Sequence, residues 1–454
     1  MFKTIRGGKL LNIFKSRKKA DTILHNGHIY SDYEISDINE ALAIKDEKII
    51  AIGVFESMEE LIGDETLIID LKGKHVFPGF IQTDKNYVNE VFFKEYVHLD
   101  EEMNVTEIMD AIDGMSYFYD DRDIIFAHGY GDDTFKESSS NEITNMLDSI
   151  SKEKPVLLVA ENNMECLYNT YAKNIILETA EEEMVEIITL PYILNLLIPY
   201  DFDQVLENVM EINEESKDKG FTTLFNAKSP YFFDEGFENA LLDLYNEENL
   251  KFKYQGSFYA NRAYKLKYIK YILGKLRTNC SELLNYIEHE VLFIDLNKQM
   301  SEEWIDEIIN YCGEINIKIQ IKCYDKEDLN KLEKVLSKRR INDNRSVVIY
   351  NDHNNSELLD VIKTSKDDFT NTEEMIKYQT EEAAERIGKE DEIGVIKEGY
   401  IADIAIFSNN PLEMTPQEFI KEDAVITIIN GKIVHDEQKD RDDEWYDIFS
   451  KAPL

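Results

Sequence analysis

Short apolar runs separated by turn residues occupy both ends of the chain. Residues 21–77 contain several strand-like runs, with a hairpin predicted to turn at Asp46-Glu47. Residues 393–436 return to the same pattern, with a second hairpin predicted at Asn430-Gly431. These β-rich ends flank a different middle region, so we expect them to pair into one small β-sandwich domain.

The middle of the chain, residues 78–392, alternates buried β-like runs with amphipathic helical stretches. Apolar runs predict strands at 124–127, 156–160, 222–225, 291–294, 315–321 and 346–350. Apolar residues at helical spacing predict helices at 202–219, 301–311 and 326–337. Regular alternation of strand and helix is typical of an α/β fold with a parallel sheet, and the length of this region suits closure into a barrel.

Charge changes the picture at one end only. The 454 residues carry a net charge of −41, which repels phosphate and argues against nucleic acid as a partner. Residues 1–20 instead hold seven basic and no acidic side chains, interleaved with apolar residues. Two interpretations of this segment stay open: a surface that contacts an anionic membrane, and a frayed basic tail. The end of the chain, 437–454, reads as a charged tail.

The cysteines indicate a reducing compartment, and the hydropathy profile shows no targeting or membrane-spanning run. Cys166, Cys280, Cys312 and Cys323 form no C-x-x-C pair and are too few for a disulfide framework in a chain this long. We find neither a cleavable signal sequence nor an apolar run long enough to cross a membrane. The sequence therefore predicts a cytoplasmic protein, and a homo-oligomer is compatible with it.

Four segments in order resemble the amidohydrolase superfamily of metal-dependent hydrolases, in the branch called amidohydrolase family three. They are the strand set ending in 69–81, the loop Gly129-Tyr130-Gly131-Asp132-Asp133, the segment 220–227, and the segment 393–404. The similarity extends over residues 21–436. It implies a (β/α)8 TIM-like barrel, shortened near its last strands, with a β-sandwich built from both chain ends. The family activity that it implies is hydrolysis of C–N bonds other than peptide bonds.

The resemblance also implies where a divalent metal would be held, and most of these positions are substituted. The family's first His-x-His pair corresponds to Asp84 and Asn86, with Lys85 between them. Asp295 is retained in a central strand, whereas Met164, Lys322 and Tyr350 stand where the family has histidine. Carboxylate and amide oxygens suit hard cations such as Mg²⁺ or Ca²⁺ better than zinc. Asp84, Asn86 and Asp295 are therefore the candidate metal ligands.

The catalytic carboxylate of the family's last strand corresponds to Asp367 or Asp368, since the register is not fixed there. Among the remaining histidines, His128 beside the Gly-Tyr-Gly loop is the one that is hardest to explain as structural. Three hypotheses follow. The protein has lost the metal site and binds a small molecule, or it is an active hydrolase with a carboxylate-rich site, or it is a structural partner of another subunit or membrane.

Overall fold

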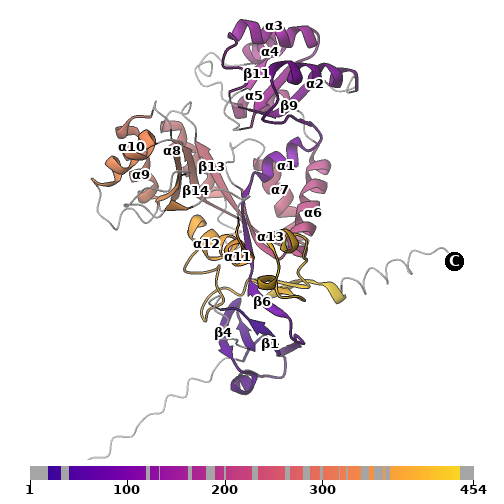
Figure 1. Ribbon diagram of the computed structural model, residues 1–454, viewed down its shortest axis with the longest axis vertical. Coiled ribbons are helices and arrows are strands. Elements are labelled where there is room, and N and C mark those ends of the chain that lie inside the picture. Colours follow the sequence, from indigo (N-terminus) through magenta and orange to yellow (C-terminus); the bar gives the residue numbers. More distant parts are fainter. Residues whose placement is uncertain are drawn as a thin grey trace, which may run out of the picture.

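The structure is a computed structural model in which α-helices and β-sheets form three regions along the long axis of the molecule (Figure 1). It describes residues 19–31, 40–118, 123–131, 133–161, 166–179, 190–198, 201–226, 234–260, 266–279, 287–296, 300–315, 317–323, 326–338, 347–351, 361–362 and 369–439. The predictions for most of the basic segment 1–20, for Met164, Asp367 and Asp368, for Cys280, and for most of the tail 437–454 lie outside the described residues.

Both chain ends contribute to a two-layer β-structure at one end of the molecule. One sheet has the order β4 (Lys48–Gly53), β3 (Ala41–Lys45), β1 (Thr22–His25) and β5 (Leu67–Asp70). The other has the order β2 (His28–Ile29), β6 (His75–Pro78), β18 (Ile404–Phe407), β19 (Ile426–Ile429) and β20 (Lys432–Asp436). Side chains of both sheets, including Leu24, Leu42, Val76, Ile404 and Ile428, are buried against one another. Burial of this shared apolar layer holds the two chain ends together.

The two predicted hairpins are present, because their turn residues adopt the backbone that such turns need. Asp46 and Glu47 have φ of 47° and 69°, and Asn430 and Gly431 have φ of 48° and 74°. Two consecutive residues with positive φ form the turn whose twist matches that of the flanking strands. In the first hairpin, Lys45 accordingly pairs with Lys48.

The central sheet consists of seven parallel strands in the described residues. Their order is β7 (Phe80–Lys85), β12 (Phe221–Asn226), β13 (Lys253–Ala260), β14 (Ile287–Asp295), β15 (Lys318–Cys323), β16 (Val347–Asn351) and β17 (Val361–Ile362). Helices α7 (Asp234–Asn246), α8 (Leu266–Asn279), α9 (Glu302–Glu314) and α10 (Lys326–Leu336) connect successive strands. Buried residues of β14 and β15 pack against α9 and α10, as expected for crossover helices that cover a parallel sheet.

The prediction of a closed barrel is not met in the part of the chain that the structure describes. β7 and β17 are the two edges of the seven-stranded sheet, and no described strand pairs across them. The predicted alternation of strands and helices is therefore confirmed, whereas the predicted closure into a barrel is not seen in these residues. Closure depends on whether the two outermost strands pair with each other, and the pattern of apolar positions within single strands contains no information on this.

Two of the predicted barrel strands belong to a different sheet. It has the order β11 (Cys166–Tyr168), β10 (Val156–Ala160), β9 (Ile125–Tyr130) and β8 (Val97–His98). Helices α2 (Val105–Phe118), α3 (Ser140–Ile150), α4 (Thr170–Thr179) and α5 (Leu190–Leu197) accompany it, opposite the β-sandwich (Figure 1). Helices α1 (Tyr87–Phe93) and α6 (Phe202–Asp218) lead away from β7 and back to β12. This small α/β unit is thus an insertion between the first two strands of the central sheet.

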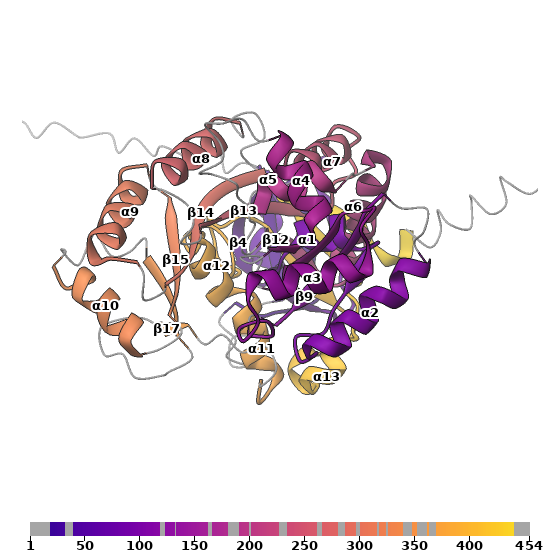
Figure 2. The ribbon, with the colours of Figure 1, turned by 90° about the horizontal axis from the view of Figure 1, so that it is seen from above.

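Short helices near the C-terminus fill the space between the sandwich and the central sheet. They are α11 (Thr372–Gln379), α12 (Glu381–Ile387) and α13 (Pro416–Phe419), with a short 3-10 helix at Pro411–Glu413. A further 3-10 helix, Phe55–Leu61, packs against β1 and β3 within the sandwich. Viewed from above, α12 lies between β15 and β12 (Figure 2). Side chains of Gln255 and Gln320 donate hydrogen bonds to the carbonyls of Ile387 and Arg386, at 3.3 and 2.8 Å. The end of α12 is thereby fixed against the inner face of the sheet.

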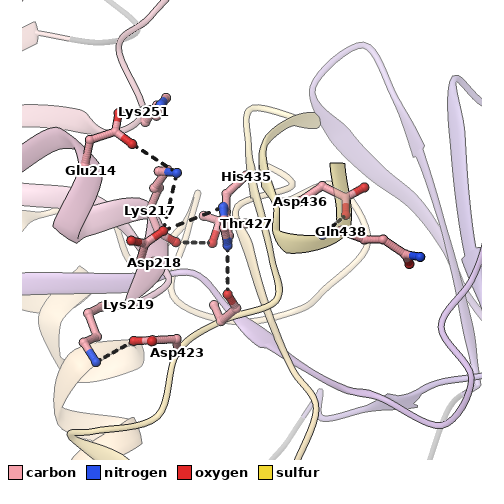
Figure 3. A network of polar contacts seen from close by, with 11 residues as sticks. Glu214, Lys217, Asp218, Lys219, Lys251, Asp423, Thr427, His435, Asp436 and Gln438 are labelled. Atoms are coloured by element: carbon pink, nitrogen blue, oxygen red, sulfur yellow. Dashed lines mark hydrogen bonds and ion pairs between the residues drawn. The ribbon is translucent and has the colours of Figure 1, made fainter. Parts of the chain in front are cut away.

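A polar network joins α6 to the sandwich (Figure 3). Lys251 lies 2.5 Å from Glu214, and Lys217 lies 3.0 Å from the same carboxylate. On the sandwich side, the buried ring of His435 lies 3.0 Å from the carbonyl of Ala424. In the described part of the chain, no helix is both long and apolar enough to cross a membrane.

Candidate functional site

The predicted metal-ligand positions lie at the carboxyl ends of strands of the central sheet, and we call this side of the sheet its carboxyl edge. Asp84 lies within β7, Asn86 directly follows it, and Asp295 is the last residue of β14. Asp295 is the register partner of Lys322, which in turn pairs with Tyr350. Because all of these strands are parallel, their carboxyl ends face the same side of the sheet. The predicted ligands therefore lie at strand ends on one side of the sheet, and β12 and β13 separate β7 from β14.

An irregularity in β7 lies just before this edge. Gln82 pairs with Leu224, whereas Lys85 pairs with Asn226, so three residues of β7 face two residues of β12. An extra residue of this kind is a β-bulge, which reverses the face toward which later side chains point. The bulge explains why Gln82 and Lys85 both line a cavity on the same face of the strand, although strict alternation would separate them.

Asn226, at the end of β12, has a structural role that the sequence did not reveal. Its side-chain oxygen accepts a hydrogen bond from the backbone N–H of Tyr87 at 2.9 Å, and its amide donates to the hydroxyl of Tyr254 at 2.9 Å. The hydroxyl of Ser257 donates to its backbone carbonyl at 2.6 Å. A fully buried carboxamide with both ends bonded fixes the start of α1 to β12 and β13. It is therefore committed to positioning this edge of the sheet.

A cleft of about 660 Å³ opens beyond the end of β7, and we call it the β7 cleft. The end of β7, α1, α6 and the inserted β8–β9 sheet all contribute to its walls. Its lining residues are Lys85, Asn86, Glu90, Phe93, Lys94, Tyr96, His98, His128, Glu161, Asn208, Glu211, Ile212 and Glu215. The cleft is therefore the space between the central sheet and the insertion.

His98 and His128 are brought together in this cleft by the pairing of β8 with β9, in which they are register partners. Their ring centroids are 5.1 Å apart. Gly129 has φ of 101°, and a Cβ there would lie 2.6 Å from Cε1 of His98, so the close approach needs glycine. Thirty residues separate the two histidines in the sequence, and only His128 had been singled out. No spacing signal could have found the pair.

His128 is the more buried of the two rings, packed 5.1 Å from the ring of Phe93. Burial first, and then the nearby His98, lower the pKa of His128 to about 4, against a hydrogen bond with the Phe93 backbone that raises it. The imidazole is therefore neutral at pH 7. A neutral ring has one nitrogen that donates a hydrogen bond and one that accepts one, so His128 can act toward a polar ligand as either donor or acceptor.

The charged side chains of the β7 cleft are mostly paired, with an excess of acid. Lys85 lies 3.5 Å from Glu90, and Lys94 forms an ion pair with Glu211. Four carboxylates face two ammonium groups across the cleft, which gives a net charge of −2 with His128 neutral. Glu215 forms no ion pair with any residue that the structure describes.

We next consider whether these residues suit a divalent metal. In the described part of the chain, no group of three or more His, Cys, Asp and Glu side chains is arranged to hold an ion. Lys85 and Asn86 line the cleft at the end of β7. An ammonium group cannot be a ligand and repels a cation, and an amide oxygen is a weak one. The donor set described at this edge does not fit a catalytic zinc, and Asp84 and Asp295 stay predicted ligands.

Comparison with known proteins agrees with the resemblance seen in the sequence. A family model described as "Amidohydrolase family" matches residues 366–435, which include α11, α12, β18 and β19. Adenine deaminase from Petrotoga mobilis is 39% identical over 72 residues, which are 16% of this chain and 11% of that protein. Protein LONG AFTER FAR-RED 3 from Arabidopsis thaliana is 30% identical over 70 residues, 15% of this chain and 12% of that protein. The chain thus matches only a small part of these relatives.

Solved structures share the fold over most of the chain. An uncharacterized metal-dependent hydrolase from Pyrococcus horikoshii is 15% identical, with a TM-score of 0.54, over 88% of this chain and 99% of that one. Atrazine chlorohydrolase TrzN from Arthrobacter aurescens, solved with zinc, is 11% identical, with a TM-score of 0.50, over 91% of this chain and 95% of that one. The family match is thus confined to residues 366–435, and the solved structures, at these low identities, show a similar fold.

Proposed function

We propose that this protein is a binding protein built on the amidohydrolase fold, which does not hydrolyse its ligand with a metal-activated water. The observation that carries the proposal is the composition of the β7 cleft. Asn86, at one of the two positions where the resemblance implies the first metal ligands, lines it together with Lys85, which stands between these two positions in the sequence. Metal-assisted hydrolysis needs ligands that set the charge and geometry around the ion, and a lysine here opposes both.

The charge of the β7 cleft favours a ligand that carries a protonated amine. Four carboxylates exceed the two lysines, and Glu215 on α6 is exposed and forms no ion pair with a described residue. The rings of Phe93 and Tyr96 line the same space, and aromatic faces attract cations. We therefore expect the occupant to be a small molecule with an amine at one end and an apolar part at the other.

Matched probes test this proposal. Benzylamine carries the cation, and benzyl alcohol has nearly the same shape without it. Calorimetry should show tighter binding of benzylamine, and Glu215→Gln should weaken its binding by about three-fold or more, because an accessible charge pair is lost. The control is Glu178→Gln, at an exposed position on α4 outside the cleft. Equal binding of the two probes, or no effect of Glu215→Gln, would refute the amine as the feature that is recognised.

Metal analysis tests the other half of the proposal. Protein purified without chelators should contain no stoichiometric zinc, iron or manganese. Stoichiometric metal that is lost in Asp84→Ala would overturn the proposal and support the second candidate below.

The second candidate function is hydrolysis of a C–N bond with a hard cation at a carboxylate-rich site. The observation that favours it is the shared edge of the sheet, at which Asp84 of β7 and Asp295 of β14 both lie near a strand end. Asp367 and Asp368 complete this hypothesis as the catalytic carboxylates. Its signature would be hydrolysis that needs added Mg²⁺ or Mn²⁺ and that falls in Asp84→Ala and in Asp295→Ala alike.

A further inference from the structure

A second cavity adjoins the β7 cleft, and we call it the outer pocket. Its volume is about 400 Å³, and α6, α11 and α13 enclose it over the face of the strand. Lys85, Ile212 and Glu215 border both this pocket and the β7 cleft. The remaining lining of the outer pocket is its own, so the inference below does not depend on the proposed function.

The walls of the outer pocket are aromatic and fixed in place. The ring of Phe80 packs edge to face against Phe221 and Phe419, with centroid distances of 6.2 and 5.7 Å. Met375 and Tyr378 of α11 complete the apolar lining. Tyr378 is held from its own side by the guanidinium of Arg386, which lies 3.7 Å from the ring centroid. A cavity with such rigid aromatic walls is suited to a flat, apolar molecule.

The lining is apolar around Phe80 and α11 but also contains polar side chains, and one of these is nearly buried without a hydrogen bond to a described residue. Gln82 is 9% exposed and lines the pocket, and its carboxamide forms no hydrogen bond with any residue that the structure describes. The buried glutamines on two other strands behave differently, since Gln255 and Gln320 both donate to carbonyls at the end of α12. The amide of Gln82 is open to the cavity, so a molecule in the pocket can supply its hydrogen bonds. Gln82 thus points to a partner that comes from outside the protein.

We propose that the outer pocket binds a neutral, planar aromatic molecule that carries an amide group, with Gln82 as the residue that recognises the amide. A carboxamide presents a donor and an acceptor in one plane, and an amide or lactam edge pairs with both at once. The nearby charge of Lys219 is already used, since it lies 2.6 Å from Asp423. Lys85 lies 3.5 Å from Glu90, so both ammonium groups of the lining already have carboxylate partners, and the amide edge, rather than an acid, is the feature that Gln82 would recognise.

Two related probes test the assignment on the intact protein. 2-Naphthamide has the planar rings and the amide, whereas methyl 2-naphthoate has the same rings and no N–H donor. Calorimetry should show that the wild-type protein binds the amide about ten-fold more tightly than the ester, in line with the worth of a buried hydrogen bond. Gln82→Leu should remove this preference, and the exposed Gln438→Leu should leave it unchanged.

A second variant keeps the test decisive if Gln82→Leu fails to fold. Gln379→Trp, at a half-buried position of the lining, should fill the pocket and abolish binding of both probes. Glu161→Gln, in the β7 cleft only, should not affect either probe. The proposal is wrong if 2-naphthamide does not bind, if the ester binds equally well, or if Glu161→Gln weakens binding as much as Gln379→Trp does.

Discussion

His128 gives the sharpest test of the β7 cleft, because its protonation is coupled to the stability of the fold. Its pKa in the folded protein is about 4, against an ordinary value of 6.5, and the main cause is burial. The unfolded chain therefore binds a proton more readily than the folded chain does between these two values. The free energy of unfolding therefore rises with pH in this window. The contribution of neutral His128 to it is fully present above pH 6.5 and is lost as the pH falls toward about 4.

The size of the effect follows from the shift. A difference of about 2.5 units corresponds to roughly 3 kcal/mol when the pH lies below both values. At about pH 5 the shift accounts for roughly 2 kcal/mol, because the folded protein is still mostly unprotonated there. We expect His128→Gln to remove most of this pH dependence while keeping a group that can donate to the Phe93 carbonyl.

Urea unfolding at pH 8 and pH 5 gives the loss of free energy of unfolding between the two pH values, and this loss is compared between the wild-type protein and His128→Gln. The wild-type protein should lose more free energy of unfolding between the two values than His128→Gln does, by about 2 kcal/mol. NMR of ¹³C-labelled histidine, assigned with the same variant, gives the pKa directly. His98→Gln should raise the pKa of His128 only in part, because burial is the larger cause. A pKa near 6.5 in the wild-type protein, or a full return to it in His98→Gln, would refute the burial argument.

Three further changes test the packing around the sheet by urea unfolding. Asn226→Ala should cost about 3 kcal/mol, because it leaves buried partners without hydrogen bonds, and a cost below about 1 kcal/mol would contradict the role assigned to it. Gly220→Ala should cost about 2 kcal/mol, since φ is +75° and a Cβ would lie 2.7 Å from Cβ of Ala405, and Gly274→Ala, with open space, is the control. Burial opposes ionisation of Glu214, but the lysines around it, Lys251 first, hold the pKa of Glu214 below its usual value. Glu214→Gln should therefore lower stability slightly at pH 7, by less than about 1 kcal/mol because the carboxylate is half exposed, and should differ less from wild type at about pH 3, because the contribution of the carboxylate declines as the pH falls toward its lowered pKa. An equal difference at both pH values would exclude the ion pairs as its source.

The individual elements were accessible from the sequence because their causes are local. The helices predicted at 202–219 and 326–337 are α6 and α10 to within a residue, since apolar spacing sets the buried face. Helix starts follow the same logic: the side chain of Ser301 accepts a hydrogen bond from the backbone N–H of Trp304 at 3.2 Å and so begins α9. The turn at Asn430-Gly431 depends on residues that tolerate positive φ.

The assembly of these elements was only partly accessible, because the partners of a strand are decided at long range. The runs at 124–127 and 156–160 were correctly predicted as strands, but the sheet that they join is the insertion and not the central one. An apolar run has the same pattern in either sheet. The parallel direction of the strands, which the sequence did predict, puts the strand ends with Asp84 and Asp295 on the same side of the sheet, and their role as ligands stays a prediction.

The sequence by itself determined the α/β class of the central region, its parallel strand direction and the chemistry of the residues at the end of β7. Only the tertiary structure decided that His98 faces His128, that Asn226 joins three elements, and that Gln82 is buried without a partner in the described chain. Each of these depends on a strand pairing or a bulge that brings distant residues together. The physical reason is that the chemistry of each side chain depends on that residue alone, whereas burial and proximity arise from packing between elements far apart along the chain.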